Sequence, residues 1–455
     1  MEVKQFYGAN CRRSGRHLRF VVSQAVPDDG NVSDVGDVSD EEEGNVTDPD
    51  FASDADSSPG SESETETNAG DDDDADDDAD ADDDDDWSKN FTTPNVTKVF
   101  SDDAGPFIYL PPDADEIAYF DQLFPETLWN LILTETKRYA NDKNRADDNL
   151  SIAELKAFIG LVLAMGIHEL PRFKNYWSHH WVLSVPQFAQ VMTRERFWYL
   201  WSNLHLVNNA NCVPATDPDH DRLFKVRPLM SKLQETFAEH YCPGQNIAVD
   251  ESMVRFKGRC TMKQYMPLKP IKRGFKIWCA ACSCCGYVVS FQMYTGREKN
   301  STAEKGLAHR VVTDLVVPLL AHKNRTVYMD NFFTSLPLFT ELEKNGTYAC
   351  GTYRTNRSGF PKELTDKPML KNLQRGDVVM RHKSGTTALV WMDKKPVYVV
   401  SNAHQPTISS INRKMSDGSV VRVSCPEIVC QYNQNMLGVD VSDQLKNCYG
   451  IDRKS

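Results

Sequence analysis

Apolar positions divide the chain into a helical first part and a strand-rich second part. From about Phe107 to Tyr241, apolar residues recur every three or four positions, a spacing typical of amphipathic helices. Ser151 and Glu154 form the pattern of a capping box at the start of one such run. Further helices are predicted over Leu128–Tyr139, Val185–Leu206 and Leu229–Tyr241. Four tryptophans here are interpreted as core aromatics rather than as platforms for stacked bases: Trp177, Trp181, Trp198 and Trp201.

From Ile247 the pattern changes to short runs rich in β-branched and aromatic residues. Ile247–Val249 predicts a buried strand that ends at Asp250. A hairpin turning at 283–286 follows, and then a helix that Thr302 caps and that ends near Pro318. The remaining elements are a strand ending at Asp330, a helix over Leu336–Lys344 and a strand over Thr347–Thr352. This order of strand, hairpin, helix, strand, helix and strand is the one expected of a ribonuclease-H-like sheet.

A polar stretch interrupts this order between about 353 and 424. It contains short apolar runs at Ala388–Met392 and Val397–Val400, which predict strands within a β-rich insertion. Pro426 suits the start of a helix that returns the chain to the sheet.

Charge is distributed very unevenly along the chain. The net charge of the 455 residues is −14, yet residues 28–86 hold 28 Asp and Glu and no Lys or Arg. Without that segment the remainder carries about +14. Residues 1–97 are therefore predicted to be a disordered acidic tail, because they cannot bury enough apolar surface to fold. The tail is interpreted as a solubiliser, and competition with nucleic acid for a basic face is the alternative.

Cysteine usage and hydropathy favour a reducing compartment. The 12 cysteines are scattered, nothing resembles a secretory signal peptide, and the longest apolar run, Phe158–Ile167, is about half of the ~20 residues that span a bilayer. We therefore expect no membrane partner. The tail begins with a small basic cluster, which is either a nuclear import signal or only a disordered basic arm: Arg12, Arg13, Arg16 and Arg19.

Four cysteines gather on the predicted hairpin: Cys279, Cys282, Cys284 and Cys285. Structural zinc normally draws on a second, distant pair of Cys or His ligands, and here all four lie on one hairpin. Cysteine is also a common small buried residue. We therefore expect no structural zinc in this chain.

Several carboxylates follow apolar runs. Asp250 and Asp330 each end a predicted strand, and Asp440 and Asp443 lie on one face if a helix begins there. A carboxylate at the end of a buried strand is costly unless a cation neutralises it, and a divalent metal would do so. Between Arg255 and Lys276 there are eight Lys or Arg and no acid, so this segment is suited to hold a phosphate chain. The alternative is a capping Asp beside a solvated basic hairpin.

These stretches resemble the three signature blocks of the piggyBac transposase family. The first block runs from Asp250-Glu251, through a Lys-Gly-Arg segment and a Lys-Pro pair, to Lys276-Ile-Trp. The second block is Tyr328-Met-Asp-Asn-Phe-Phe-Thr-Ser. The third block runs from Tyr432-Asn-Gln to Gly438-Val-Asp and Asp443-Gln. Further family-like segments precede them in the same order, so the resemblance covers about 98–455.

The resemblance implies a fold, a metal and a reaction. The implied fold is an α/β RNase-H-like catalytic core with an N-terminal all-helical domain, a β-rich insertion and the acidic tail. Asp250, Asp330 and Asp440 would hold Mg²⁺ or Mn²⁺, with Asp443 as a further catalytic acid. The implied activity is cleavage and transfer of double-stranded DNA at TTAA sites, by a nuclear homodimer. Five cations would contact the DNA backbone: Arg255, Lys257, Arg259, Lys263 and Lys276.

The predicted domains are a tail over 1–97, a helical dimerisation or DNA-binding domain over 98–245, a first part of the catalytic core over 246–352, an insertion over 353–424 and a final core helix over 425–455. The family continues past the segment at which this sequence ends, at Ser455. We therefore expect the helix bearing Asp440 to lack packing partners and strand cleavage to be weak.

Three hypotheses stay open from the sequence. The chain is a piggyBac-like DDE/D transposase or domesticated derivative, a catalytically inactive DNA-binding or dimerising protein that retains the fold, or a protein-interaction factor that works through its tail.

Overall fold

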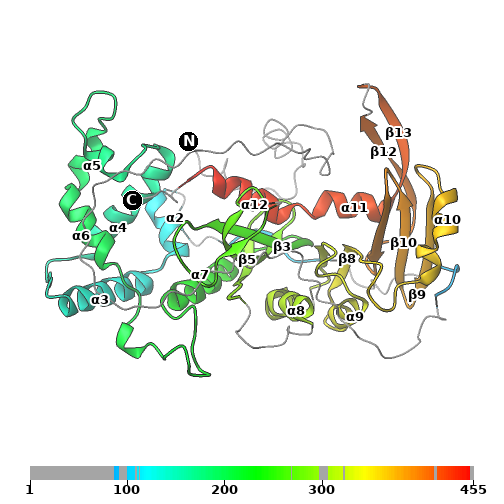
Figure 1. The fold of residues 1–455 in the computed structure, drawn as a ribbon, viewed down its shortest axis with the longest axis horizontal. Helices are drawn as coiled ribbons and strands as arrows, with labels where there is room; N and C mark the ends of the chain where they lie inside the picture. Colours follow the sequence, from blue (N-terminus) through cyan, green and yellow to red (C-terminus); the bar gives the residue numbers. More distant parts are fainter. Residues whose placement is uncertain are drawn as a thin grey trace, which may run out of the picture.

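The computed structural model describes residues 87–450, except 92–99, 108–109, 112, 268, 297–305, 321–322 and 415–417. Most of the predicted tail, the basic cluster at 12–19 and the Thr302 cap lie outside the described residues. The molecule is elongated, with a helical part at one end, a central sheet, and a β-rich part at the other end (Figure 1). No helix among the described residues is long and apolar enough to cross a membrane.

The last part of the predicted tail contacts the β-rich end. The indole of Trp87 packs against the main core and donates a hydrogen bond to the carbonyl of Gly359 at 3.0 Å. Ser88 pairs with His382, whose ring also meets Phe91 edge-on. The prediction that disorder extends to residue 97 is therefore wrong for 87–91, because Trp87 supplies the apolar surface that the acidic segment lacks.

The helical part forms a separate hydrophobic core around fully buried aromatic side chains such as Trp129, Phe158 and Phe197. The predicted run over 185–206 breaks into two helices, because Thr193 caps the second one by accepting a hydrogen bond from the amide of Arg196. The helices are α2 (Glu116–Leu123), α3 (Glu126–Asp142), α4 (Ile152–Ile167), α5 (Pro186–Val191), α6 (Arg194–Asn203) and α7 (Arg227–Glu239).

The predicted capping box forms only in part. The hydroxyl of Ser151 accepts from the amide of Glu154 at 3.3 Å, as expected. The Glu154 carboxylate instead pairs with the guanidinium of Arg196, which also bonds Asp147 at 2.5 Å. The acid therefore joins α4 to α6 rather than closing its own helix.

The tryptophans divide between core and surface. Trp177 and Trp198 are partly buried against the helical core, and Trp201 stacks on Phe197 while 40% exposed. Trp181 is 85% exposed, so its assignment to the core is wrong. Trp181 lies in the loop between the 3₁₀ turn Phe173–Trp177 and α5. This loop does not cover the indole ring with other apolar side chains.

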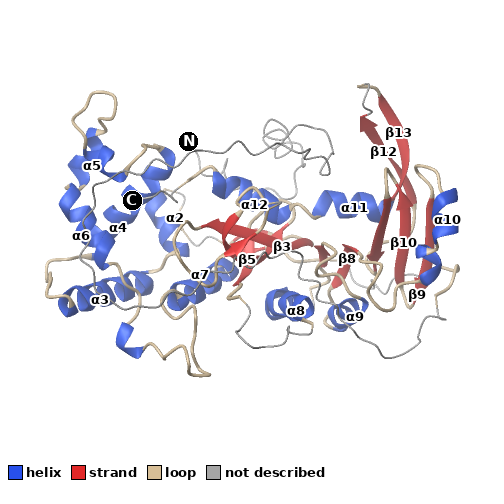
Figure 2. Cartoon of the chain, viewed as in Figure 1, coloured by secondary structure: helices blue, strands red, loops and turns tan. Residues whose placement is uncertain are grey.

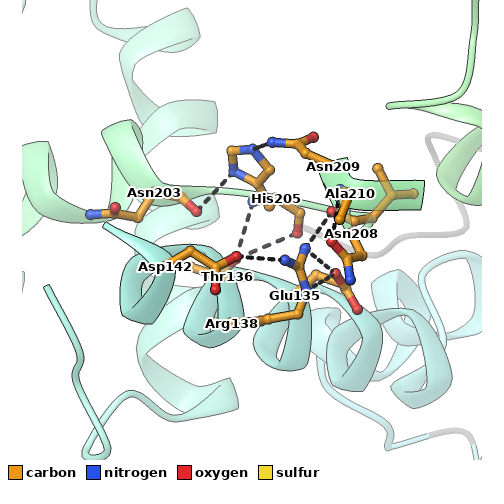
Figure 3. A network of polar contacts seen from close by, with 10 residues as sticks. Glu135, Thr136, Arg138, Asp142, Asn203, His205, Asn208, Asn209 and Ala210 are labelled. Carbon is orange, nitrogen blue, oxygen red and sulfur yellow. Dashed lines mark hydrogen bonds and ion pairs between the residues drawn. The ribbon is translucent and has the colours of Figure 1, made fainter. Parts of the chain in front are cut away.

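A polar network ties α3 to the segment that follows α6 (Figure 3). The guanidinium of Arg138 bonds Glu135 at 2.6 Å, Asp142 at 2.9 Å and the carbonyl of Val207 at 2.7 Å. The amide of His205 donates to the hydroxyl of Thr136. The network satisfies polar groups of the loop at the point where it leaves the helical core.

One nine-stranded sheet runs through the rest of the molecule. Its order is β4-β5-β3-β7-β8-β11-β10-β9, with β6 paired to the outer side of β5. The pairs β3–β7 and β7–β8 are parallel, and the pairs β3–β5 and β5–β6 are antiparallel. The strands are β3 (Asn246–Arg255), β4 (Gln264–Tyr265), β5 (Arg273–Cys282), β6 (Val288–Met293), β7 (Thr326–Met329), β8 (Tyr348–Thr352), β9 (Val378–Lys383), β10 (Thr386–Met392) and β11 (Pro396–Ser401).

Helices cover both faces of this sheet (Figure 2). On one face α8 (Leu307–Leu320) and α9 (Leu336–Lys344) pack against side chains such as Val249 and Met329. On the other face α11 (Glu427–Asn435) packs against Tyr328, and α12 (Gly438–Asn447) packs against Ala248. Alternate residues of one strand thus serve opposite layers. Helix α8 includes Pro318 and ends two residues later, at Leu320, close to the predicted end.

Residues 353–424 are rich in strands, as predicted, and three of these strands extend the main sheet. β11 pairs with β8 in antiparallel fashion, so β11, β10 and β9 continue the sheet outward. β12 (Ile408–Lys414) and β13 (Val420–Pro426) form a separate two-stranded ribbon that projects from the molecule (Figure 1). Two further short strands, β1 (Gly105–Pro106) and β2 (Tyr241–Cys242), pair with each other and join the segment before α2 to the end of α7.

Candidate functional site

Asp250 lies in the middle of β3 rather than at a strand end. The strand was predicted to stop at Asp250, but it continues to Arg255 because β5 pairs with its whole length. The parallel partner β7 is shorter and its last pair joins Val249 to Met329. The next residue on each strand is an aspartate, so Asp250 and Asp330 lie side by side where β7 ends.

Three carboxylates gather at this point. One oxygen each from Asp250, Glu251 and Asp330 lies within 4.8 Å of the others. Asp250 is 5% exposed and Glu251 is 7% exposed. The amide of Phe332 donates to Asp330 at 2.9 Å and fixes its orientation. The structure therefore concentrates negative charge in a buried place, which demands compensation.

Two lysines provide part of that compensation. The Lys269 Nζ lies 3.4 Å from Asp250 Oδ2 and donates to the carbonyl of Glu251 at 3.1 Å. The Lys276 Nζ lies 3.0 Å from Glu251 Oε1, with the Lys276 side chain 15% exposed. Lys276 is thus engaged inside the site, whereas the other predicted DNA-backbone cations lie beyond it, from Arg255 at the end of β3 into the loop that follows.

The predicted DNA-backbone cations on that loop differ in exposure. Arg255, Lys257 and Arg259 are exposed, and Lys263 is half-buried and bonds the carbonyl of Gly258 at 3.1 Å.

Burial and charge shift the acid pKa values in different directions. Burial raises the pKa of Asp250 well above its ordinary value, although Lys269 opposes the shift. Burial and the charge of Glu251 raise the pKa of Asp330 to about 6. For Glu251 burial is the largest effect and acts upward, but Lys276, the hydrogen bond with Asp250 and the charge of Lys269 together lower its pKa. The site is therefore short of positive charge beside Asp250 and Asp330.

Helix α12 brings the other two predicted acids to the same edge of β3. Asp443 accepts hydrogen bonds from the Ser252 hydroxyl at 2.6 Å and from Lys446 Nζ at 2.7 Å. Asp440 is not one of the three carboxylates within 4.8 Å of one another. It faces the same Lys269, and burial raises its pKa. The structure thus brings Asp250 and Asp330 together, and Asp440 lies outside this group but within the electrostatic influence of Lys269.

A close approach of backbones positions α12. A Cβ at Gly438 would lie 3.0 Å from the Cβ of Ala248 and 3.1 Å from the carbonyl oxygen of Cys282. The hydroxyl of Ser283 donates to the carbonyl of Asn435 at 2.6 Å, just before the helix. Only glycine allows the helix to start this close to the sheet.

The donor set fits a hard divalent cation. Mg²⁺ and Mn²⁺ prefer carboxylate oxygens, and Asp250, Glu251 and Asp330 supply these within one small volume. Burial is the main cause of the raised pKa values of Asp250 and Asp330, and a bound cation would stabilise their charged forms. Lys269 lies against the same oxygens, so it would have to share or yield that position.

Two members of the site were missed as functional residues from the sequence. Glu251 stands directly after Asp250, and Lys269 precedes a proline within the basic segment. Adjacent residues of a strand normally face opposite sides, so the pattern alone gave no reason to place Glu251 with Asp250. The one available signal was the run of eight Lys and Arg over Arg255–Lys276, which contains Lys269.

Comparison with known proteins places the fold and the sequence of this chain among transposases. The structure superposes on a piggyBac transposase in a synaptic complex with hairpin DNA, with a TM-score of 0.64 and 24% sequence identity, over 78% of this chain and 72% of that chain. This shows the fold of a transposase core. A family model described as Transposase IS4 matches residues 115–455. The chain therefore belongs to the Transposase IS4 family, among its piggyBac-type members.

Human relatives support the same placement. Human PiggyBac transposable element-derived protein 3 is 32% identical over 322 residues, which cover 69% of this chain and 53% of that protein. Human PiggyBac transposable element-derived protein 2 is 30% identical over 345 residues, covering 72% of this chain and 55% of that protein. The chain thus spans about half the length of these curated relatives.

Proposed function

We propose that this protein is a piggyBac-like DDE/D transposase or domesticated derivative, which cleaves and transfers double-stranded DNA at TTAA sites in the nucleus, as a homodimer. The observation that carries the proposal is the convergence of Asp250 and Asp330 from strands far apart in sequence. The order β6-β5-β3-β7-β8, with its two parallel pairs, supports an RNase-H-like core. Membership of a transposase family supports DNA as the substrate.

Asp250 and Asp330 would hold Mg²⁺ or Mn²⁺, with Glu251 beside them and Asp440 completing the set from α12. Bound cations of this kind activate an attacking hydroxyl and stabilise the departing oxygen of a phosphodiester. Lys269 balances the negative charge of the cluster, and Lys276 holds Glu251 ionised. Arg255, Lys257 and Arg259 would lie along the DNA backbone.

A second candidate function is DNA binding without catalysis. It is favoured by the position of Asp440 outside the group of three carboxylates and by the ion pairs that already occupy Asp250 and Glu251. In this case the fold and its basic loop would be retained for binding or dimerisation.

A nicking assay on DNA ends flanked by TTAA separates the two functions. With Mg²⁺ present, the wild-type chain is expected to nick the ends and Asp250→Asn is expected to abolish nicking. The matched control is Asp314→Asn, which alters an exposed aspartate of α8 paired with Arg310. Equal binding by all three proteins with no nicking by any of them would favour the non-catalytic function.

A further inference from the structure

Three thiols meet at the end of the β5–β6 hairpin, on a part of the molecule that the proposed reaction does not use. Cys282 ends β5, and Cys284 and Cys285 belong to the turn that follows. Their sulfur atoms lie within 4.8 Å of one another, and the Cys282 and Cys284 sulfurs are 3.3 Å apart. Cys279, the fourth cysteine of the hairpin, is instead buried against α12.

A distant segment completes the surroundings of these thiols. The amide of Gly244 donates to the Cys282 sulfur at 3.4 Å, and the Tyr241 hydroxyl lies 2.8 Å from the Cys285 sulfur. Cys282 is buried and Cys284 is exposed, so the group has an inner anchor and an open side.

We propose that Cys282, Cys284 and Cys285 form a binding site for one Zn²⁺ ion, with the fourth position open to solvent beside Cys284. Sulfurs about 2.3 Å from a tetrahedral zinc ion are about 3.8 Å from one another, which agrees with the spread of these thiols. This reverses the expectation that the chain holds no zinc. That expectation required a second pair of ligands, whereas the three thiols, with Cys282 buried among them, already form a compact soft site.

The site would stiffen the support of α12. A Cβ at Gly286 would lie 2.8 Å from Val441 in that helix, and Ser283 bonds the carbonyl of Asn435 just before it. The turn between these thiols therefore lies directly beneath the segment that carries Asp440. An ion that fixes the turn would fix the start of the helix.

The test is zinc binding by the full 455-residue chain. Reduced protein is loaded with Zn²⁺, dialysed and assayed for metal content, and Co²⁺ titration then reports thiolate ligation through its charge-transfer absorption. About one ion per chain is expected. Cys284→Ser is expected to weaken binding at least about 100-fold, because even changes outside the ligand set cost about 10–100-fold. Cys284 is exposed, so this variant should fold, as circular dichroism will show.

The matched control is Cys212→Ser, which alters an exposed cysteine of the helical part. It is expected to leave zinc content and the Co²⁺ spectrum unchanged. Removal of zinc by a chelator should also speed amide exchange in the turn and in α12 of the wild type, but not of Cys284→Ser. Absence of bound zinc in the wild type, equal zinc in Cys284→Ser, or a Cys282–Cys284 disulfide in the purified protein would overturn the proposal.

Discussion

At the scale of single residues, the structure distinguishes buried charges that are compensated from those that are not. Glu251 and Lys276 form a pair in which both side chains are nearly covered, whereas Lys232 and Glu235 form a pair on the surface of α7. A buried ion is costly when its partner is removed, and a surface ion is not. Removing one partner is therefore expected to destabilise the protein much more in the buried pair than in the surface pair.

We expect Lys276→Met to lower the free energy of unfolding by about 3 kcal/mol, because it leaves the Glu251 carboxylate buried and unpaired. Urea denaturation of the purified protein measures the change. Lys232→Met serves as the control and should change stability by less than about 1 kcal/mol. Equal effects of the two substitutions would mean that Glu251 finds another partner.

His404 makes stability depend on pH. Burial lowers the pKa of its imidazole to about 4, and the ring lies between the hydroxyls of Tyr328 and Ser401 at 3.0 and 2.9 Å. The unfolded chain binds a proton near pH 6.5 and the folded one does not. The stabilisation of the folded state by neutral His404 is therefore complete above about pH 6.5 and is lost as the pH falls towards 4.

We expect the wild type to lose about 2–3 kcal/mol more stability than His404→Gln between pH 7 and pH 4. Urea denaturation at several pH values measures the difference between the two proteins, which cancels the titration of all other groups. Parallel curves for the two proteins would show that His404 is protonated in the folded state as easily as in the unfolded chain.

At the scale of elements, the start of α12 depends on the absence of a side chain. A Cβ added at Gly438 would lie 3.0–3.2 Å from Ala248, Cys282 and Ser283, so a methyl group requires these neighbours or the helix to move. Gly160 in α4 has nothing within 4 Å of its added Cβ. The same substitution should thus have opposite effects in the two helices.

We expect Gly438→Ala to destabilise the protein by about 1–3 kcal/mol, because the helix must move off the sheet. Gly160→Ala is expected to stabilise it by about 0.5–1 kcal/mol through helix propensity. Thermal and urea denaturation compare both variants with the wild type. Hydrogen exchange should place the loosening caused by Gly438→Ala in α12, and an effect spread over the helical part would contradict this account.

At the scale of the whole molecule, an acidic segment and a basic remainder are joined in one chain. The elements with exposed cations, such as the loop with Lys257 and Arg259, extend from the same sheet edge that holds the acids. A polyanion attracted to these cations therefore competes with the chain's own acidic segment for the same cations.

We expect the protein to bind duplex DNA with an affinity that falls steeply with salt, by a log–log slope of about −0.9 for each phosphate neutralised. Deletion of residues 28–86 should raise the affinity if those acids compete for the same face. Fluorescence anisotropy at several salt concentrations measures both effects. Equal affinity with and without residues 28–86 would leave the segment as a solubiliser, and weak binding without salt dependence would contradict DNA as the partner.

The sequence by itself determined the elements and most of the acids. The spacing of apolar residues located α9, and short apolar runs located the β5–β6 hairpin, because local spacing and turn residues determine such elements. The family resemblance located Asp250, Asp330, Asp440 and Asp443, and the family is confirmed.

Only the tertiary structure decided which of these side chains meet. Strand pairing placed Asp250 within a long β3, since β5 is a long-range partner that no local pattern reports. Long-range contacts likewise brought Glu251 and Lys269 into the site and placed Gly244 against the thiol of Cys282. Contacts between residues far apart in the chain depend on register and on the closeness of backbones, and these exist only when the whole sheet has formed.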